Sequence, residues 1–137
     1  MIRDIVKDTF FLQQKSRPAT EADTQIGQDL LDTLEAHKDH CVGLAANMIG
    51  QAVCIIALRV GDGSLLMYNP VYKKVSPKTY DTEEGCLSLT GVRPVTRYEW
   101  VEVEFRDQNF KKQVAKFKGF EAEIIQHEVD HCQGILI

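Results

Sequence analysis

Two histidines four residues apart near the end of the sequence, His127 and His131, constrain this chain more than any other feature. Apolar residues recur around them at helical spacing, which predicts a helix over residues 120–132. On a helix, positions i and i+4 lie on one face, so both imidazoles project to the same side. Two neutral imidazoles at this spacing are typical of a divalent metal site, and the adjacent Glu128 is typical of the base that activates the attacking water. The sequence therefore indicates a metal-dependent hydrolase.

Length and composition fit one globular domain over residues 1–137, because the chain is 44% hydrophobic and long enough to bury a core. The net charge of −4 argues against a nucleic-acid binding protein, which would carry a basic surplus. No stretch has the length and apolarity of a membrane helix, and the first residues lack an apolar signal core. We therefore expect a cytoplasmic protein with its four cysteines reduced.

Periodicity divides the rest of the chain into a helix followed mainly by strands. A helix is expected over residues 23–38 and a buried strand over 52–58. After a turn, further extended and loop segments are expected: a strand at 65–69 closed by Asn69-Pro70, an extended piece at 71–80 broken at Pro77, a segment at 83–97 that is loop-like at both ends with a short apolar centre, and a hairpin of 100–105 with 113–117. This order predicts an α+β fold, with antiparallel strands and hairpins packed around the C-terminal metal-binding helix and an N-terminal helix before them.

A catalytic metal normally has three protein ligands and one open position, so a third ligand is needed. Cys86 is the stronger candidate, because Gly85 beside it lets the backbone approach closely. Its alternative role is that of a small buried apolar residue. The two other histidines, His37 and His40, are interpreted as residues at a helix C-terminus, where they suit the helix dipole.

Three short stretches resemble, in order, the signature motifs of the peptide deformylases: Val42-Gly43-Leu44-Ala45-Ala46, Glu84-Gly85-Cys86-Leu87-Ser88 and Gln126-His127-Glu128-Val129-Asp130-His131. The resemblance spans essentially the whole chain and suggests a short, atypical member of that family. It implies hydrolysis of the N-formyl group from formyl-methionine at the N-terminus of nascent polypeptides, with release of formate. The partners it implies are the N-formylmethionyl peptide and transient proximity to the ribosome.

The resemblance also implies which residues act. Cys86, His127 and His131 would hold one divalent metal, usually Fe(II), with Zn, Ni or Co also accepted. The donor set does not itself choose among these ions. The general base would be Glu128, and the backbone N–H of Leu87 would hold the oxyanion.

Other positions would contribute through the same motifs. Gly43 belongs to the site through the first motif. Gln126 and Asp130 would support the ligands, unless they are exposed to solvent. An arginine at the position of Arg93 would pair with a carboxylate such as Glu84, unless it is a surface cation.

The first motif departs from the family pattern at Met48. The family motif ends Ala-Ala-x-Gln, and its glutamine donates a hydrogen bond to the developing oxyanion, whereas Met48 has no donor. Loss of one such donor typically costs ~10²–10³ in rate. Cys41 and Cys132 replace a glycine and a leucine, and Cys132 is interpreted as a buried apolar thiol rather than a redox residue or ligand.

Two alternatives to an active deformylase remain open. One is a weakly active or inactive metal-binding paralogue, or one that acts on another N-acyl amide, and Met48 favours it. The other is a non-enzymatic domain that keeps the metal for stability. The presence of Glu128 and the lack of an obvious fourth ligand favour an enzyme.

Overall fold

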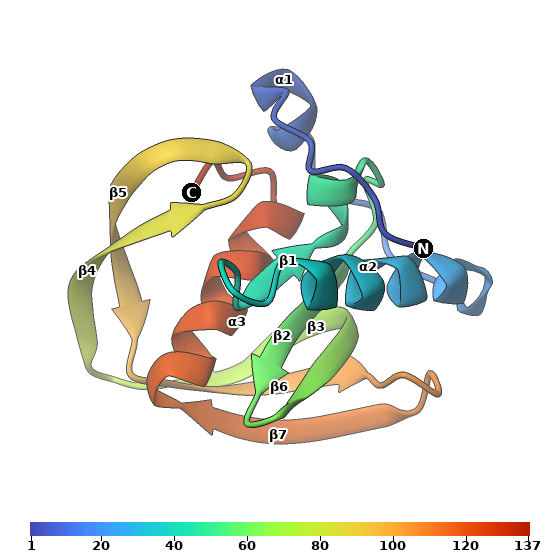
Figure 1. Ribbon diagram of the computed structural model, residues 1–137. Coiled ribbons are helices and arrows are strands. Elements are labelled where there is room, and N and C mark those ends of the chain that lie inside the picture. Colours follow the sequence, from blue (N-terminus) through green and yellow to red (C-terminus); the bar gives the residue numbers. More distant parts are fainter.

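Two antiparallel sheets and a long C-terminal helix make up most of the computed structural model, which describes residues 1–137 (Figure 1). The larger sheet has five strands in the order β1-β2-β3-β6-β7, and the smaller is the β4–β5 hairpin. The strands are β1 (Gly43–Ala45), β2 (Ile55–Val60), β3 (Gly63–Val75), β4 (Thr79–Cys86), β5 (Leu89–Tyr98), β6 (Trp100–Arg106) and β7 (Lys112–Lys118). The predicted α+β fold with its hairpins is confirmed.

The third strand is longer than predicted. The expected end of this strand at Asn69-Pro70 is wrong, because β3 continues to Val75. Asn69 has a φ of 54°, and the pairing of β3 with β6 shifts register between Tyr68 and Val71. A bulge therefore takes up the proline, which has no N–H for the ladder, without ending the strand. The predicted break at Pro77 is present, since β4 begins at Thr79.

The segment 83–97 was expected to be loop-like at both ends, and this is wrong. It contains the end of β4 and nearly all of β5, which pair from Thr79↔Tyr98 to Cys86↔Leu89 with only Leu87 and Ser88 between them. A two-stranded hairpin exposes much of both faces, so its sequence lacks the clean apolar alternation of a strand that covers a core. The hairpin carries Cys86 at its tip.

The two long helices agree closely with the sequence pattern, whereas the short helix and 3₁₀ turns outside them were not predicted. They are α1 (Thr9–Leu12), α2 (Thr24–Ala36) and α3 (Gly119–Cys132), with short 3₁₀ turns η1 (Glu21–Asp23) and η2 (Ala46–Ile49). The turn after α3 fits tightly, since Gly134 has a φ of 78° and an added Cβ would lie 2.3 Å from the carbonyl oxygen of Gln13. The end of α3 is thereby fixed against the N-terminal segment.

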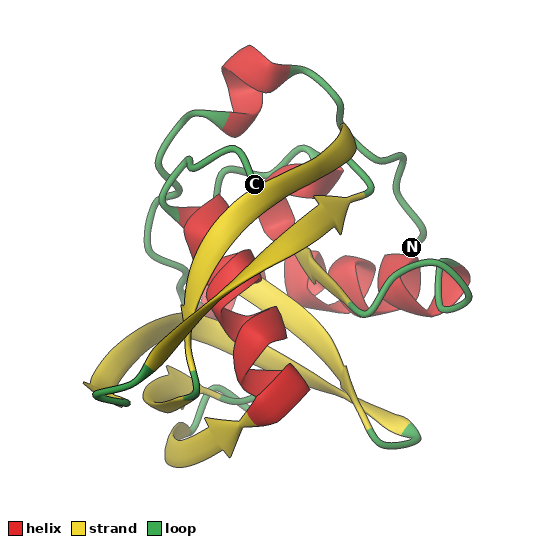
Figure 2. Cartoon of the chain, turned by 90° about the vertical axis from the view of Figure 1, so that its left-hand side faces the viewer, coloured by secondary structure: helices red, strands yellow, loops and turns green.

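Helix α3 lies between the two sheets. It contacts β1, β2 and β7 of the larger sheet on one side and β5 of the hairpin on the other. Figure 2 shows the hairpin crossing in front of this helix. A core of 25 buried residues, among them Leu44, Ile56, Met67 and Ile125, joins α3 and α2 to the larger sheet. This packing fixes the position of α3 on the larger sheet, and the helix face that carries the two predicted histidines points toward the hairpin.

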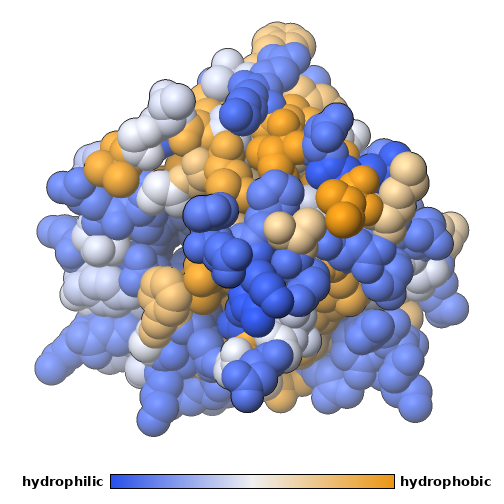
Figure 3. Space-filling model, in the orientation of Figure 1, coloured by the Kyte–Doolittle hydropathy of each residue, from blue (hydrophilic) through white to orange (hydrophobic).

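The surface is mainly polar. Figure 3 shows hydrophilic residues over most of one face, with hydrophobic residues gathered in its upper half. Among the helices, none combines the length and the apolar character needed to cross a membrane.

Candidate metal centre

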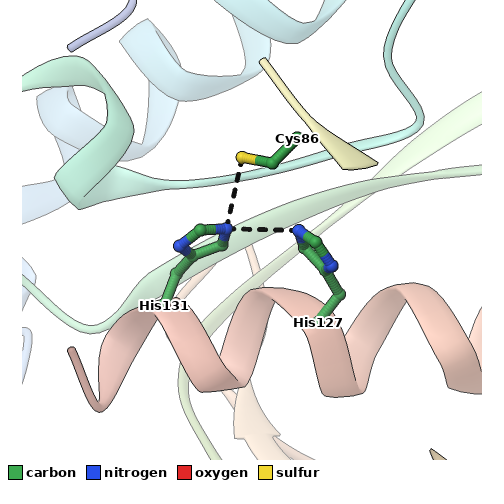
Figure 4. A group of neighbouring side chains, drawn as sticks. All are labelled: Cys86, His127 and His131. Atoms are coloured by element: carbon green, nitrogen blue, oxygen red, sulfur yellow. Dashed lines mark hydrogen bonds between the residues drawn. The ribbon is translucent and has the colours of Figure 1, made fainter. Parts of the chain in front are cut away.

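Three side chains with metal-binding atoms meet between the hairpin and α3 (Figure 4). His127 and His131 project from α3, and their Nε2 atoms are 3.2 Å apart. Cys86 reaches them from the tip of β4, with its Sγ 3.4 Å from His131 Nε2. The structure therefore brings together the three residues predicted from the two motifs.

This donor set fits a divalent transition metal. The three ligand atoms lie within 4.8 Å of one another, so one ion could reach all of them with bonds of about 2.0–2.3 Å. One thiolate and two imidazoles suit iron, zinc, nickel or cobalt. A closed structural site would need a fourth protein ligand, and no further His, Cys, Asp or Glu joins this group. The arrangement is that of an open, catalytic type of metal site.

The orientation of His127 is set by a buried carboxylate. Its Nδ1 donates to Glu84 Oε1 at 2.7 Å, which leaves Nε2 to face Cys86 and His131. Glu84 in turn accepts from Arg97, through Nε at 3.0 Å and Nη2 at 2.6 Å. The remaining Arg97 nitrogen, Nη1, donates to Asp130 Oδ2 at 2.6 Å. A carboxylate behind a ligand histidine fixes its tautomer and increases its basicity.

The expected partner of Glu84 was Arg93, and this is wrong. Arg93 is the cross-strand neighbour of Glu84 in the hairpin, but its Nη2 donates only to the carbonyl of Thr90, at 3.5 Å. Arg97 is four residues further along β5 and is 5% exposed, between the hairpin and α3. Arg93 and Arg97 are four residues apart on β5 and share a face, and Arg97 is the one that meets Asp130 of α3, a tertiary contact that sequence spacing did not reveal.

The ligand histidines have opposite electrostatic environments. Burial and the positive charges of His127 and Arg97 lower the pKa of His131 to about 3, so its imidazole is neutral. For His127, burial lowers the pKa, but Glu128, Cys86 and Glu84 outweigh it and raise the pKa to about 10. A metal ion replaces such a proton when it binds, which makes affinity depend on pH.

Glu128 is a buried carboxyl beside the ligands. It is 4% exposed, lines the same pocket as Cys86 and His127, and its Oε1 has no hydrogen-bond partner. Burial raises its pKa to about 7, against the opposing effect of His127. A carboxyl group with a pKa near neutrality can both accept and return a proton.

The pocket next to the metal ligands has a volume of about 510 Å³. Gly43, Met48 and Leu87, predicted from the first and second motifs, all lie on its wall. Gly43 has no room for a side chain, since an added Cβ would lie 2.6 Å from Ile124 Cγ2 and 3.0 Å from Glu128 Oε2. Gly43 therefore lies directly against the face of α3 that carries Glu128.

Met48 occupies the position at which the family has a donor. Its side chain is 1% exposed, and its Sδ accepts from the Ala45 N–H at 3.5 Å. The neighbouring Asn47 does not replace the donor, because its Nδ2 is used by the carbonyl of His131 at 2.9 Å. The pocket thus has no side-chain amide from this motif.

The remaining predicted residues lie around the centre rather than in it. Asp130 supports it through Arg97, whereas Gln126 is buried and bonds the backbone N–H and carbonyl of Tyr98. His37 Nδ1 lies 2.9 Å from the carbonyl of Thr33, in agreement with a role at the end of α2. His40 lies at the rim of the pocket.

Sequence reasoning missed one further pair near the centre. Tyr80 of β4 donates its hydroxyl to Glu123 Oε1 of α3 at 3.1 Å, and Glu123 also lines the pocket. The signal available was the position of Glu123, four residues before His127 and so on the same helix face.

Comparison with known proteins agrees with this geometry. The profile of the polypeptide deformylase family matches residues 2–137. A peptide deformylase from Clostridium beijerinckii is 53% identical over 100% of both chains, and one from Pelotomaculum thermopropionicum is 43% identical over 78% of this chain and 70% of its own.

Solved structures give the same result. A class I type b peptide deformylase from Acinetobacter baumannii superimposes with a TM-score of 0.88 at 27% identity, over 99% of this chain and 96% of the other. The enzyme from Thermotoga maritima gives 0.87 at 27% identity, over 99% and 94%. The predicted family is confirmed: the chain belongs to the polypeptide deformylases.

Proposed function

We propose that this protein is a metal-dependent hydrolase that removes the N-formyl group from formyl-methionine at the N-terminus of polypeptides and releases formate. The observation that carries the proposal is the convergence of Cys86, His127 and His131 in a pocket that also contains the buried carboxyl of Glu128. The resident ion in this proposal is Fe(II), and the enzyme works in the cytoplasm near the ribosome, where nascent chains emerge.

The metal, when bound, supplies a Lewis acid that polarises the formyl carbonyl and makes the attacking water more acidic. The chain supplies the orientation of that ion. Glu84 holds His127 by its Nδ1, and Arg97 holds Glu84 with two hydrogen bonds. Because both are buried, the imidazole cannot rotate away without breaking an ion pair.

Glu128 moves the proton. Its carboxylate takes a proton from the attacking water and delivers it to the leaving amine, which becomes the free N-terminus of the polypeptide. The residue is suited to this because its Oε1 makes no hydrogen bond within the chain and lies in a pocket with the ligands. A purely structural metal site would have no need of such a group.

The negative charge that develops on the formyl oxygen would be stabilised by the backbone N–H of Leu87, which follows the ligand Cys86. Gly43 leaves the space beside Glu128 open for the reacting group. Met48 contributes no donor, so a second candidate function is a slower deformylase, or one that prefers another N-acyl amide. The buried thioether at this position is the observation that favours it.

The test is formate release from an N-formylmethionyl tripeptide by protein loaded anaerobically with iron or nickel. We expect one metal ion per chain and catalytic release of formate. The Glu128→Gln variant should keep the metal and lose activity by ~10²–10⁴, the usual contribution of a general base. Formate release that persists undiminished in Glu128→Gln, or a wild type that hydrolyses acetyl but not formyl peptides, would contradict the proposal.

A further inference from the structure

The two histidines of the metal centre differ in what lies behind their rings. His127 donates its Nδ1–H to Glu84, whereas the Nδ1 atom of His131 is buried and has no hydrogen-bond partner within the chain. Figure 4 shows this second nitrogen of His131 pointing away from Cys86 and His127. A histidine that binds metal almost always gives its other ring N–H to an oxygen, so a partner for His131 remains to be assigned.

The position of the proton on His131 follows from the placement of its ring. Its Nε2 faces the other two ligand atoms, 3.4 Å from Cys86 Sγ and 3.2 Å from His127 Nε2. A neutral imidazole carries one proton, so a ring that binds metal through Nε2 carries its proton on Nδ1. The Nδ1–H is then a buried donor, and a buried donor without an acceptor costs free energy.

The side chain of Asn47 contacts His131 from the first motif. Asn47 lies in η2 and is 1% exposed, and its Nδ2 donates to the carbonyl of His131 at 2.9 Å. Because a carbonyl only accepts, the amide nitrogen must face it, and the amide oxygen is the free end. This Oδ1 is also buried without a partner in the chain. A donor that needs an acceptor and an acceptor that needs a donor thus belong to two residues in direct contact.

Ser88 is the competing acceptor. Its Oγ is buried and unpaired as well, and its backbone N–H donates to Cys86 Sγ at 3.4 Å. Asn47 is favoured because its side chain already bonds His131 itself, whereas Ser88 meets the centre through its backbone and at a different ligand.

We propose that Asn47 is a positioning residue of the metal centre, with its amide nitrogen on the His131 carbonyl and its amide oxygen accepting the Nδ1 proton of the metal-binding ring, directly or through one buried water. Asn47 then does for His131 what Glu84 does for His127, with a neutral group in place of a charged one. The inference rests on the metal-binding part of the proposed function and not on its substrate.

The experiment uses the zinc-loaded full chain with ¹⁵N-labelled histidine, and NMR of the imidazole nitrogens. We expect one slowly exchanging Nδ1–H signal from His127 and one from His131, and Glu84→Gln identifies the first. Asn47→Leu keeps the side-chain volume and should shift the His131 proton upfield, because its hydrogen bond is lost. Ser88→Ala should leave this proton where it is.

Zinc affinity, measured by competition with a chelator, is a second readout. Asn47→Leu should bind zinc about 10–100-fold more weakly. Asn47→Asp keeps an oxygen at the position of Oδ1 and should retain more of the affinity. The matched control is Asn69→Asp, since Asn69 donates to the Ala19 carbonyl at 2.9 Å and accepts from its N–H at 2.7 Å, away from the centre. Urea unfolding of the zinc-free variants checks that each is folded.

The inference is overturned if the His131 proton is unchanged in Asn47→Leu, or if Ser88→Ala shifts it instead. It is also overturned if Asn47→Asp loses as much affinity as Asn47→Leu, or if Asn69→Asp does, since the loss would then be one of general stability. A wild type that binds no zinc would overturn both this inference and the proposed function. Failure in the Asn47 variants alone leaves the proposed function standing.

Discussion

Glu84 lies behind His127, and its Oε1 accepts the Nδ1–H of that ligand at 2.7 Å. Replacing Glu84 by glutamine keeps an acceptor oxygen but removes the charge that makes the imidazole a stronger ligand. We expect the affinity for metal to fall about 10–100-fold. Competition with a chelator measures this, and Glu83→Gln, the exposed neighbour on the same strand, is the control. Equal losses in the two variants would mean that the charge near the pocket matters and the contact does not.

The positive charge of Arg97 offsets the cost of burying the carboxylate of Glu84. Arg97→Met leaves that carboxylate without its ion-pair partner, so the free energy of unfolding should fall by about 3–5 kcal/mol. Arg93→Met, at the position first expected to pair with Glu84, should change it by less than about 1 kcal/mol. Urea denaturation with metal present compares the two. A larger loss in Arg93→Met would show that the pairing seen here is not the stabilising one.

Gly43 tests whether the first motif positions the base. An alanine there would place its Cβ 3.0 Å from Glu128 Oε2 and closer still to Ile124. We expect kcat/KM to fall by about 10², the usual effect of a displacement near 1 Å in a catalytic group. Metal content should not change. Gly63→Ala, whose Cβ would meet nothing closer than 3.8 Å, should leave both quantities as they are.

Met48→Gln restores a side-chain donor at the pocket wall. If the missing hydrogen bond limits the rate, kcat/KM should rise, by up to ~10² on the scale of oxyanion donors. Met48→Leu keeps the apolar volume without a donor and should give no gain. Steady-state kinetics of the two variants with formyl-methionyl peptides shows whether a donor or the packing at this position limits the rate. A gain in both variants would assign the effect to packing.

The ionisation of Asp23 should account for part of the loss of stability of this protein in acid. Hydrogen bonding from Arg17 lowers its pKa to about 2, more than burial raises it. Because the folded pKa lies below the ordinary value of 3.8, the carboxylate stabilises the fold above pH 4 and loses this effect as the pH falls toward 2.

Asp23→Asn should therefore be less stable than the wild type by about 1 kcal/mol near neutral pH, since Arg17 is largely exposed. The difference should shrink to zero near pH 2. Asp62→Asn, in the β2–β3 turn, is the control. A difference that stays constant from pH 7 to pH 2 would rule out the ion pair as its cause.

The sequence predicted most of what rests on local periodicity. The helix that carries His127 and His131 was placed almost to the residue, because both the apolar spacing and the ligand spacing follow the helical repeat. Cys86 was a candidate third ligand from the residues themselves, with a buried apolar thiol as its alternative, and the family resemblance assigned it. No local pattern relates residues 41 positions apart in the chain.

What the sequence could not give depended on pairing register and tertiary packing. The β4–β5 hairpin is polar and partly exposed on both faces, so its strands carry a weak signal. Even the register does not select Arg97, because Arg93 is the cross-strand neighbour of Glu84; the packing of α3, which brings Asp130 to Arg97, distinguishes the two arginines. The bulge at Asn69 was missed for a related reason, because proline normally ends a strand and only the tertiary pairing with β6 allows it to continue.

The metal ligands come from parts of the fold that share no strand pairing. Cys86 belongs to the two-stranded hairpin, and both histidines belong to the helix that packs on the larger sheet. A bound ion is therefore a cross-link between two layers as well as a reagent. The free energy of binding it is added to that of docking the hairpin, so an enzyme that loses its metal also loses part of what closes its pocket.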